Sequence, residues 1–516
     1  MARLLTFLLA APVLGALVAY VVARTSERAA RYLTSGAAAS AATVAIALWF
    51  RYVPRGPEWQ FTERMDLFPP IGVNYALGID GLALSFIVLS ALVAMLCVWS
   101  IGPPHRAAYG AMLVLEAGLL GTFVSLDLLL HVLFWTLAFG GAAALLASVG
   151  VSRRLAAGLA VAVVLSAVLM LAGVLALDSH YRALSSIHNL DMRAYQQLAL
   201  PAPLQTRVFL AFLPAIAMAP VMFFVLARTA SGGRAFLLLP GVLVLNAGIY
   251  QLLRISLPIL PDASRRFVPA MLWIAVVVFV LSAVTSVLRR EWKPSIASVS
   301  LAYAALAALG ALTLTLDGLT GAIVQHVALT LAIGAIVLAE GSRQFASGSR
   351  ARMLLVVVLV GMLSLAGVPL LGGFVGLRRT VEGVWSINRA AAVVLAVGIV
   401  VAAIGLLRLY LQRSTRVEQA PDSTQMTVRP MQVMLPAVPA LLLLWIGLYP
   451  PPLLNTIETA VARVVMRVSP QYAAEVADCL SQPATPAPAI PGLPAVVAVA
   501  PCADGAKSPP PSLPVK

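Results

Sequence analysis

Few ionisable side chains interrupt the long apolar segments of this chain, and those few could do chemistry there. Glu116 is the only Asp or Glu near the centre of such a segment, and His131 and His326 each lie within one. A carboxylate or imidazole surrounded by hydrocarbon is costly unless it is neutral or paired, and such groups commonly mark proton paths. All three are candidates for residual proton movement, with a hydrogen-bonded packing role as the alternative.

Other polar residues in or beside these segments are weaker candidates. Tyr303 and Asn246 could line a wet path, although neither readily carries a net charge near pH 7. Lys293 stands at the edge of an apolar segment, where an interfacial position is the alternative to a proton path. Asp80 and Asp127 precede apolar segments, and we expect both to cap helices.

No motif indicates soluble-type catalysis. The three cysteines lack metal-ligand spacing, and no phosphate-binding loop, dinucleotide fingerprint or nucleophile elbow is present. We therefore expect no catalytic residue, no metal site and no cofactor in this chain.

The composition indicates whether this chain folds in water or in a lipid bilayer. The 516 residues are 61% hydrophobic and 11% charged, which is too apolar for a water-soluble protein of this size. The formal charge of +15 comes from arginines in short clusters between apolar runs, so it reflects membrane topology and predicts no nucleic-acid partner. The lipid bilayer is the expected surrounding.

The apolar runs predict an all-α polytopic membrane protein. A hydrocarbon core of about 30 Å needs roughly 20 apolar residues per helix, and about fourteen runs approach that length. They start near Leu4, Ser35, Leu82, Tyr109, Leu128, Leu155, Val208, Phe236, Val268, Ile296, Ala322, Met353, Ala391 and Met434. Prolines and paired glycines predict kinked or broken spans at Pro214, Pro220, Pro240, and Pro369 with Gly372 and Gly373.

Basic residues predict the orientation. Arginines follow every odd-numbered span, whereas the even loops around Asp127 and Asp317 carry no base. The positive-inside rule then places odd loops in the cytoplasm and both termini in the periplasm. The Pro/Ala-rich tail beyond Pro470 is expected to be disordered or loosely attached, and Cys479 and Cys502 could form a disulfide in that oxidising compartment.

Seven segments of the chain have a distinctive sequence: GVNYALGIDGLAL from Gly72, EAGLLGTFVSLDLLLHVLFW from Glu116, YQLLRISLPILPDAS from Tyr250, GAIVQHVALTLAIGA from Gly321, LAGVPLLGGFVG from Leu365, LLRLYLQ from Leu406 and LLLLWIGLYPPPLL from Leu441. In this order they resemble chain M of the membrane arm of bacterial complex I, the relative of mitochondrial subunit 4. The first resembles an amphipathic lead-in to the third helix. The resemblance runs from roughly Leu4 to Leu454.

This resemblance implies fourteen transmembrane helices with two inverted five-helix repeats and broken helices. The expected divisions are helices 1–3 at 1–107, a first antiporter-like repeat (helices 4–8) at 108–260, a second repeat (helices 9–13) at 261–418, helix 14 and its flank at 419–469, and the tail at 470–516.

The resemblance also shows what this chain lacks. The family's proton path uses a glutamate on the fifth helix, lysines on the seventh and eighth, histidines on the tenth and eleventh, and a glutamate on the twelfth. The corresponding positions hold Thr136, Ala219, Asn246, Tyr303, Leu329 and Leu377. Lysine occurs only at 293, 507 and 516, so no realignment restores a lysine within a span.

The expected function is therefore a chain M-like subunit of a proton-translocating NADH:quinone oxidoreductase, complex I or a relative, in a bacterial inner membrane. Its partners would be other membrane-arm subunits, and it would have no redox centre of its own. Because the Lys/Glu path is largely lost, we expect a structural or weakly coupling role. The alternatives are an ion-translocating subunit of a cation/proton antiporter, membrane hydrogenase or bicarbonate-uptake system, and a non-transporting assembly subunit.

Overall fold

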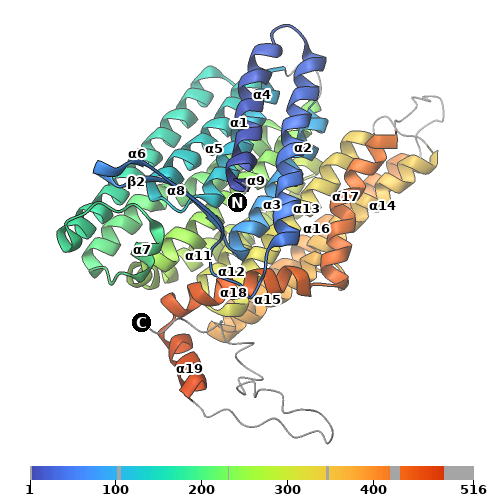
Figure 1. Ribbon diagram of the computed structural model, residues 1–516. Helices are drawn as coiled ribbons and strands as arrows, with labels where there is room; N and C mark the ends of the chain where they lie inside the picture. Colours follow the sequence, from blue (N-terminus) through green and yellow to red (C-terminus); the bar gives the residue numbers. More distant parts are fainter. Residues whose placement is uncertain (1–2, 102–105, 231, 344–347, 419–429, 482–516) are drawn as a thin grey trace, which may run out of the picture.

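A computed structural model describes the chain except for residues 1–2, 102–105, 231, 344–347, 419–429 and 482–516. Long helices run side by side in one bundle (Figure 1). The first half contains α1 (Leu4–Val22), α2 (Glu27–Arg51), α3 (Gly81–Ser100), α4 (Arg106–Val124), α5 (Leu128–Ser148), α6 (Arg153–Ser185), α7 (Met192–Gln197), α8 (Ala202–Thr229) and α9 (Leu238–Gln251). The second half contains α11 (Pro261–Leu288), α12 (Trp292–Leu312), α13 (Leu316–Arg343), α14 (Gly348–Leu365), α15 (Gly372–Ile387), α16 (Arg389–Glu418), α17 (Pro430–Leu448), α18 (Pro451–Val468) and α19 (Pro470–Ser481).

The predicted all-α membrane fold is confirmed, with a slightly different number of spans. Within the described residues, 12 helices are long and apolar enough to cross a membrane, or 13 if α17 and α18, bent by 75°, form one span. About fourteen were expected. The run from Met353 forms α14, which stops at a break before α15. The repeat boundaries at 108–260 and 261–418 stay predictions.

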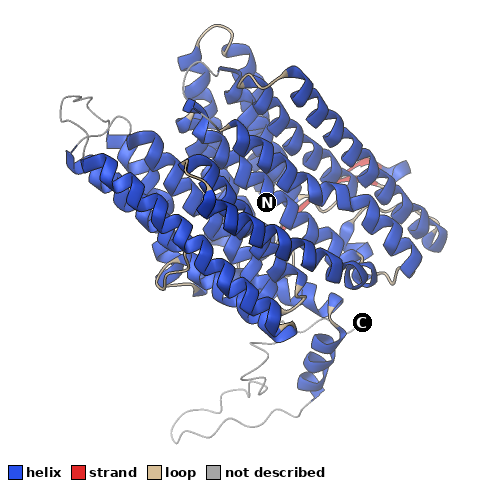
Figure 2. Cartoon of the chain, turned by 180° about the vertical axis from the view of Figure 1, so that it is seen from behind, coloured by secondary structure: helices blue, strands red, loops and turns tan. Residues whose placement is uncertain are grey.

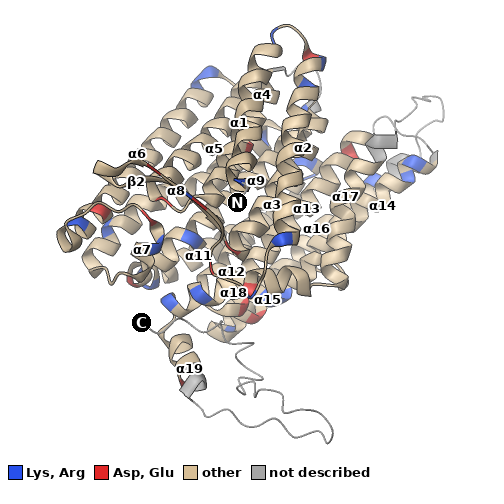
Figure 3. Ribbon diagram, in the orientation of Figure 1, with Lys and Arg blue, Asp and Glu red and all other residues tan. Residues whose placement is uncertain are grey.

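Two helices form the centre of the bundle. The most apolar windows of α13 and of the span that contains α9 are completely buried, whereas those of α1, α6 and α11 are one-third buried or less. These outer helices expose apolar faces, as expected for surfaces that meet lipid or other subunits. Lys and Arg lie mainly at helix ends and in loops (Figure 3). Polar groups on α9 and α13 are thus shielded from the surroundings of the bundle.

The predicted breaks are partly found. α14 ends at Leu365 and α15 begins at Gly372, so the segment with Pro369 does interrupt a span. α8 is one continuous helix through Pro214 and Pro220, so no break is found there. Pro240 lies in the first turn of α9, and that span is instead irregular at the π-helical turn η3 (Leu252–Ser256) before the short α10 (Leu257–Ile259).

The segment from Gly72 is a strand where an amphipathic lead-in was expected. β2 (Val73–Ile79) pairs antiparallel with β1 (Gln60–Phe68) after the turn η1 (Pro69–Ile71), which forms the small hairpin of Figure 2. Gly72 has a φ of 68° and lies against His188, so a side chain there would be strained and would clash. Main-chain pairing with β1 makes this lead-in to α3 a strand.

Beyond α17 the chain leaves the upright bundle. α18 lies across the helix ends and packs against α3 and α13, and α19 projects outward (Figure 1). The expected disordered tail therefore begins with a helix. Cys479 belongs to α19, whereas Cys502 lies outside the described residues, so the Cys479–Cys502 disulfide stays a prediction.

Candidate functional site

His131 and Gln251 connect α5 to the central helix α9. The Nε2 atom of His131 lies 2.6 Å from Oε1 of Gln251, and its Nδ1 lies 3.2 Å from the carbonyl oxygen of Thr122. Both ring nitrogens thus face oxygen atoms. A protonated ring satisfies both contacts as placed, whereas a neutral ring needs the Gln251 amide turned so that it donates to Nε2.

A second contact connects α9 to α13. Nδ1 of His326 lies 3.1 Å from Oδ1 of Asn246, and the Asn246 amide donates to Oγ1 of Thr330 at 3.2 Å. All three side chains are buried. The structure therefore brings together Asn246 and His326, two candidates that lie 80 residues apart in the sequence.

We call His131, Gln251, Asn246, His326 and Thr330 the polar chain. Asn246 and Gln251 are five residues apart on α9, so roughly 7.5 Å of helix axis separates its two halves. No Lys, Asp or Glu belongs to it. The polar chain can orient helices and hold a proton at a histidine, but it contains no carboxylate–lysine pair.

Glu116 and Tyr303 make no hydrogen bond with the polar chain. Both carboxyl oxygens of Glu116 on α4, and the hydroxyl of Tyr303 on α12, are buried without a hydrogen-bond partner in the described part of the chain. An unpaired buried carboxylate is costly in its charged form, so Glu116 has the surroundings of a neutral acid. Lys293 lies in the first turn of α12, and its Nζ atom is 5.8 Å from the centre of the Trp292 ring.

An apolar cavity lies beside Ala219, the residue predicted to stand in place of a family lysine. Ala219 of α8 and His326 are both among its lining residues, and the cavity has a volume of about 390 Å³. The other lining residues are apolar, from α8, α9, α11 and α12. Cavities with such walls stay dry. Apart from His326, this cavity therefore offers no polar side chain to water.

The other positions where we predicted a lost family residue make ordinary helix contacts. Thr136 donates its hydroxyl to the Val132 carbonyl within α5, Leu329 is buried on α13, and Leu377 of α15 packs beside Gly367. None of these side chains places a titratable group in the bundle.

A buried ion pair that we did not predict lies one turn beyond Gln251. Arg254 of η3 contacts Asp80 with an N–O distance of 2.8 Å, and their side chains are 4% and 3% exposed. The guanidinium also lies 4.3 Å from the centre of the Trp59 ring. Asp80 accepts a hydrogen bond from the Ala83 amide, which confirms its expected capping role. An arginine within an apolar run, in the segment YQLLRIS, was the signal that could have revealed this pair.

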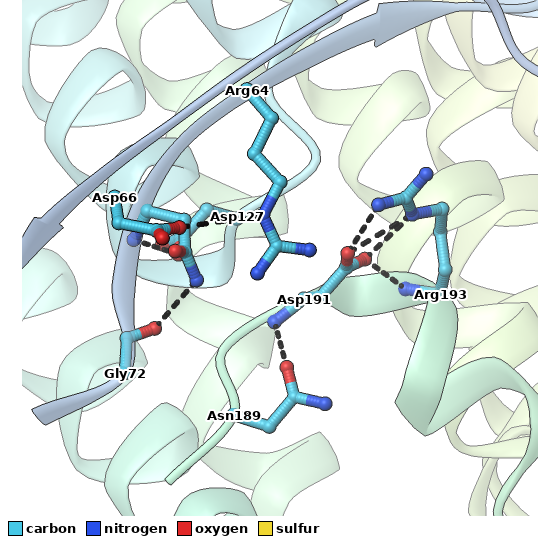
Figure 4. Close-up of polar contacts among 8 residues, drawn as sticks. Arg64, Asp66, Gly72, Asp127, Asn189, Asp191 and Arg193 are labelled. Carbon is cyan, nitrogen blue, oxygen red and sulfur yellow. Dashed lines mark hydrogen bonds and ion pairs between the residues drawn. The ribbon is translucent and has the colours of Figure 1, made fainter. Parts of the chain in front are cut away.

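A polar cluster joins the hairpin to the start of α5 (Figure 4). Asp127 accepts hydrogen bonds from the Leu129 and Leu130 amides, so it caps α5 as expected, and from the Asn74 amide of β2. Burial raises the pKa of Asp127 to about 6, although these hydrogen bonds oppose the shift. Nearby, Asp191 pairs with Arg193. This cluster organises a helix end outside the apolar segments.

No metal centre is evident in the described ranges, where no three His, Cys, Asp or Glu side chains are grouped to hold an ion. The helical bundle, with its long apolar spans and shielded polar centre, defines a multi-pass membrane protein. The model of the NADH:quinone oxidoreductase/Mrp antiporter transmembrane family matches residues 125–404. The chain belongs to that family.

Curated relatives resemble this chain over most of its length. NADH-quinone oxidoreductase subunit M of Rickettsia typhi is 25% identical over 439 residues, which cover 79% of this chain and 86% of the relative. NAD(P)H-quinone oxidoreductase chain 4 3 of Trichormus variabilis is 26% identical over 494 residues, covering 89% and 91%.

Solved structures share the fold. A chain of respiratory complex I from Thermus thermophilus with bound NADH has a TM-score of 0.77 at 20% identity, covering 90% of this chain and 100% of that chain. A chain of the archaeal membrane-bound sulfane sulfur reductase has a TM-score of 0.70 at 18% identity, covering 92% and 99%.

Proposed function

We propose that this chain is a subunit M-type component in the membrane arm of a bacterial NADH:quinone oxidoreductase or a related complex, with a structural or weakly coupling role. Relatives over most of the chain are named subunit M or chain 4, and the fold matches chains of multisubunit membrane complexes. Its partners are the other membrane-arm subunits, met through the exposed apolar faces of outer helices. The chain supplies no redox centre.

One observation supports the structural or weakly coupling role. The polar chain is built from neutral amides, a hydroxyl and two histidines. His131 pairs with Gln251, and His326 pairs with Asn246, where the family would place a lysine on α9. Beside them, Ala219 faces an apolar cavity. A pump needs titratable groups whose charges shift one another, and this centre contains no lysine–glutamate pair.

The orientation and location are part of the same proposal. Arginine-bearing odd loops favour the cytoplasm, which places both termini in the periplasm and the chain in the bacterial inner membrane.

A second candidate, residual proton movement, is favoured by Glu116. It is a buried carboxyl group without a hydrogen-bond partner among the described residues, and such a group can gain or lose a proton if water reaches it. In that case Glu116 on α4 would let the chain contribute weakly to proton translocation by the complex.

The test is to purify the native complex through a tag on this chain, identify co-purifying proteins by mass spectrometry, and measure protons moved per electron pair in proteoliposomes. We expect membrane-arm partners and an unchanged ratio in Glu116→Gln. The matched control is Glu382→Gln, which changes an exposed partner of Arg378. A ratio that falls only in Glu116→Gln would contradict the structural role, and purification without membrane-arm partners would contradict the assignment itself.

A further inference from the structure

A large cavity lies at one end of the bundle, away from the polar chain. It has a volume of about 780 Å³ and is lined by the last turns of α8, α11 and α16 and the first turns of α12. These ends adjoin the predicted cytoplasmic loops, at the level where a bilayer has its headgroups.

Basic side chains dominate its polar wall. The lining includes five bases and one acid, Glu291; the bases are Arg228, Arg289, Arg290, Lys293 and Arg413. Outside the lining, Glu340 pairs with Arg413 at 3.5 Å. Even if Glu291 and Glu340 each neutralise one base, three positive charges remain. Such an excess favours an anionic ligand.

The remaining wall is apolar and continues onto the outer face of the bundle. Leu281 and Leu301 line the cavity together with Phe223 and Phe224. Leu281 is 61% exposed, and Leu288 at the end of α11 is 72% exposed. The cavity therefore joins a charged pocket to an apolar surface of the kind that faces acyl chains.

We propose that this cavity binds an anionic phospholipid. Arg289, Arg290 and Lys293 hold the phosphodiester, because guanidinium groups donate charge-assisted hydrogen bonds to phosphate oxygens. The acyl chains follow Leu281 and the outer face of α11 into the bilayer. Basic pockets between transmembrane helices on the cytoplasmic side are suited to lipid headgroups of this charge. This gives Lys293 an interfacial role distinct from any proton path.

The test compares lipids retained by the full chain after exchange into nanodiscs that contain equal amounts of phosphatidylglycerol and phosphatidylcholine. The variant is Arg289→Gln with Arg290→Gln, at two exposed positions. The control is Arg153→Gln with Arg154→Gln, an arginine pair at the start of α6, on the same predicted side, that does not line the cavity. Thermal unfolding of each variant checks that the fold is retained.

We expect native mass spectrometry to show at least tenfold preferential retention of phosphatidylglycerol by the unmodified chain and by the control, and loss of that preference in the variant. Millimolar inorganic phosphate should not displace the lipid, because it lacks acyl chains. Equal retention in variant and control, displacement by phosphate alone, or a protein segment cross-linked within the cavity of the purified complex would each overturn the proposal.

Discussion

Nε2 of His131 and Oε1 of Gln251 lie 2.6 Å apart, which joins α5 to the fully buried α9. This contact links two parts of the chain that are 120 residues apart. Its loss would leave a buried imidazole with only one of its two present contacts.

Gln251→Leu should therefore lower the free energy of unfolding by about 1–3 kcal/mol, the cost of leaving a buried polar group unsatisfied. Gln325→Leu is the matched control, because the Gln325 amide is buried on α13 without a hydrogen-bond partner among the described residues. Its replacement should cost less. Thermal unfolding in detergent measures both, and equal losses would contradict a specific role for the His131 contact.

The Arg254–Asp80 pair should be strongly sensitive to removal of one partner. Arg254→Met leaves a buried carboxylate unpaired and should cost about 3–5 kcal/mol of stability. Adding Asp80→Asn in the same chain should recover part of that loss. Arg378→Gln, which breaks an exposed pair with Glu382, should cost about 0–1 kcal/mol in the same denaturation series. A double variant no more stable than Arg254→Met would argue against the ion-pair explanation.

The packing of α4 on α5 depends on Gly118. A Cβ atom at Gly118 would lie 2.1 Å from the backbone nitrogen of Ala138, so Gly118→Ala must separate the helices and should cost about 1–3 kcal/mol. Gly140→Ala, where no atom lies within 4 Å, should leave stability unchanged or raise it by about 0.5–1 kcal/mol. Melting temperatures of the two variants provide the comparison; a tolerated Gly118→Ala would show that the contact can relax.

Asp127 should make stability depend on pH. Burial raises its pKa from 3.8 to about 6, so the folded state holds this proton more tightly than the unfolded state does. The resulting stabilisation is complete below about pH 4 and is lost as the pH rises through 6. Asp127→Asn should flatten the melting temperature between pH 4 and pH 7 relative to the unmodified chain. A steeper dependence, or the same one, would show that other groups control this window.

Local sequence was sufficient for the helix starts and for one break. Asp80 and Asp127 cap α3 and α5 as expected, because a carboxylate immediately before an apolar run accepts the free amides of the first turn. Pro369 and the following glycines do interrupt a span. The hairpin at Gly72 was missed, because strand pairing depends on a partner, β1, whose register no local pattern reveals.

The candidate site was predicted in its parts and not in its arrangement. Asn246, His131 and His326 were named separately, whereas Gln251 and Thr330 were overlooked because buried amides and hydroxyls have no distinctive spacing in an apolar helix. Glu116 was named as a separate candidate for residual proton movement, and its carboxyl group has no hydrogen-bond partner among the described residues.

The sequence by itself determined that the chain spans a membrane and where most of its spans begin. It also determined that lysine is missing from the middle of every span. These properties depend only on the length of the apolar runs and on residue identity. Only the tertiary structure decided that His131 meets Gln251 and His326 meets Asn246, that Arg254 pairs with Asp80, and that basic helix ends surround one cavity. Such contacts join residues far apart in the chain, and helix packing alone selects which of them meet.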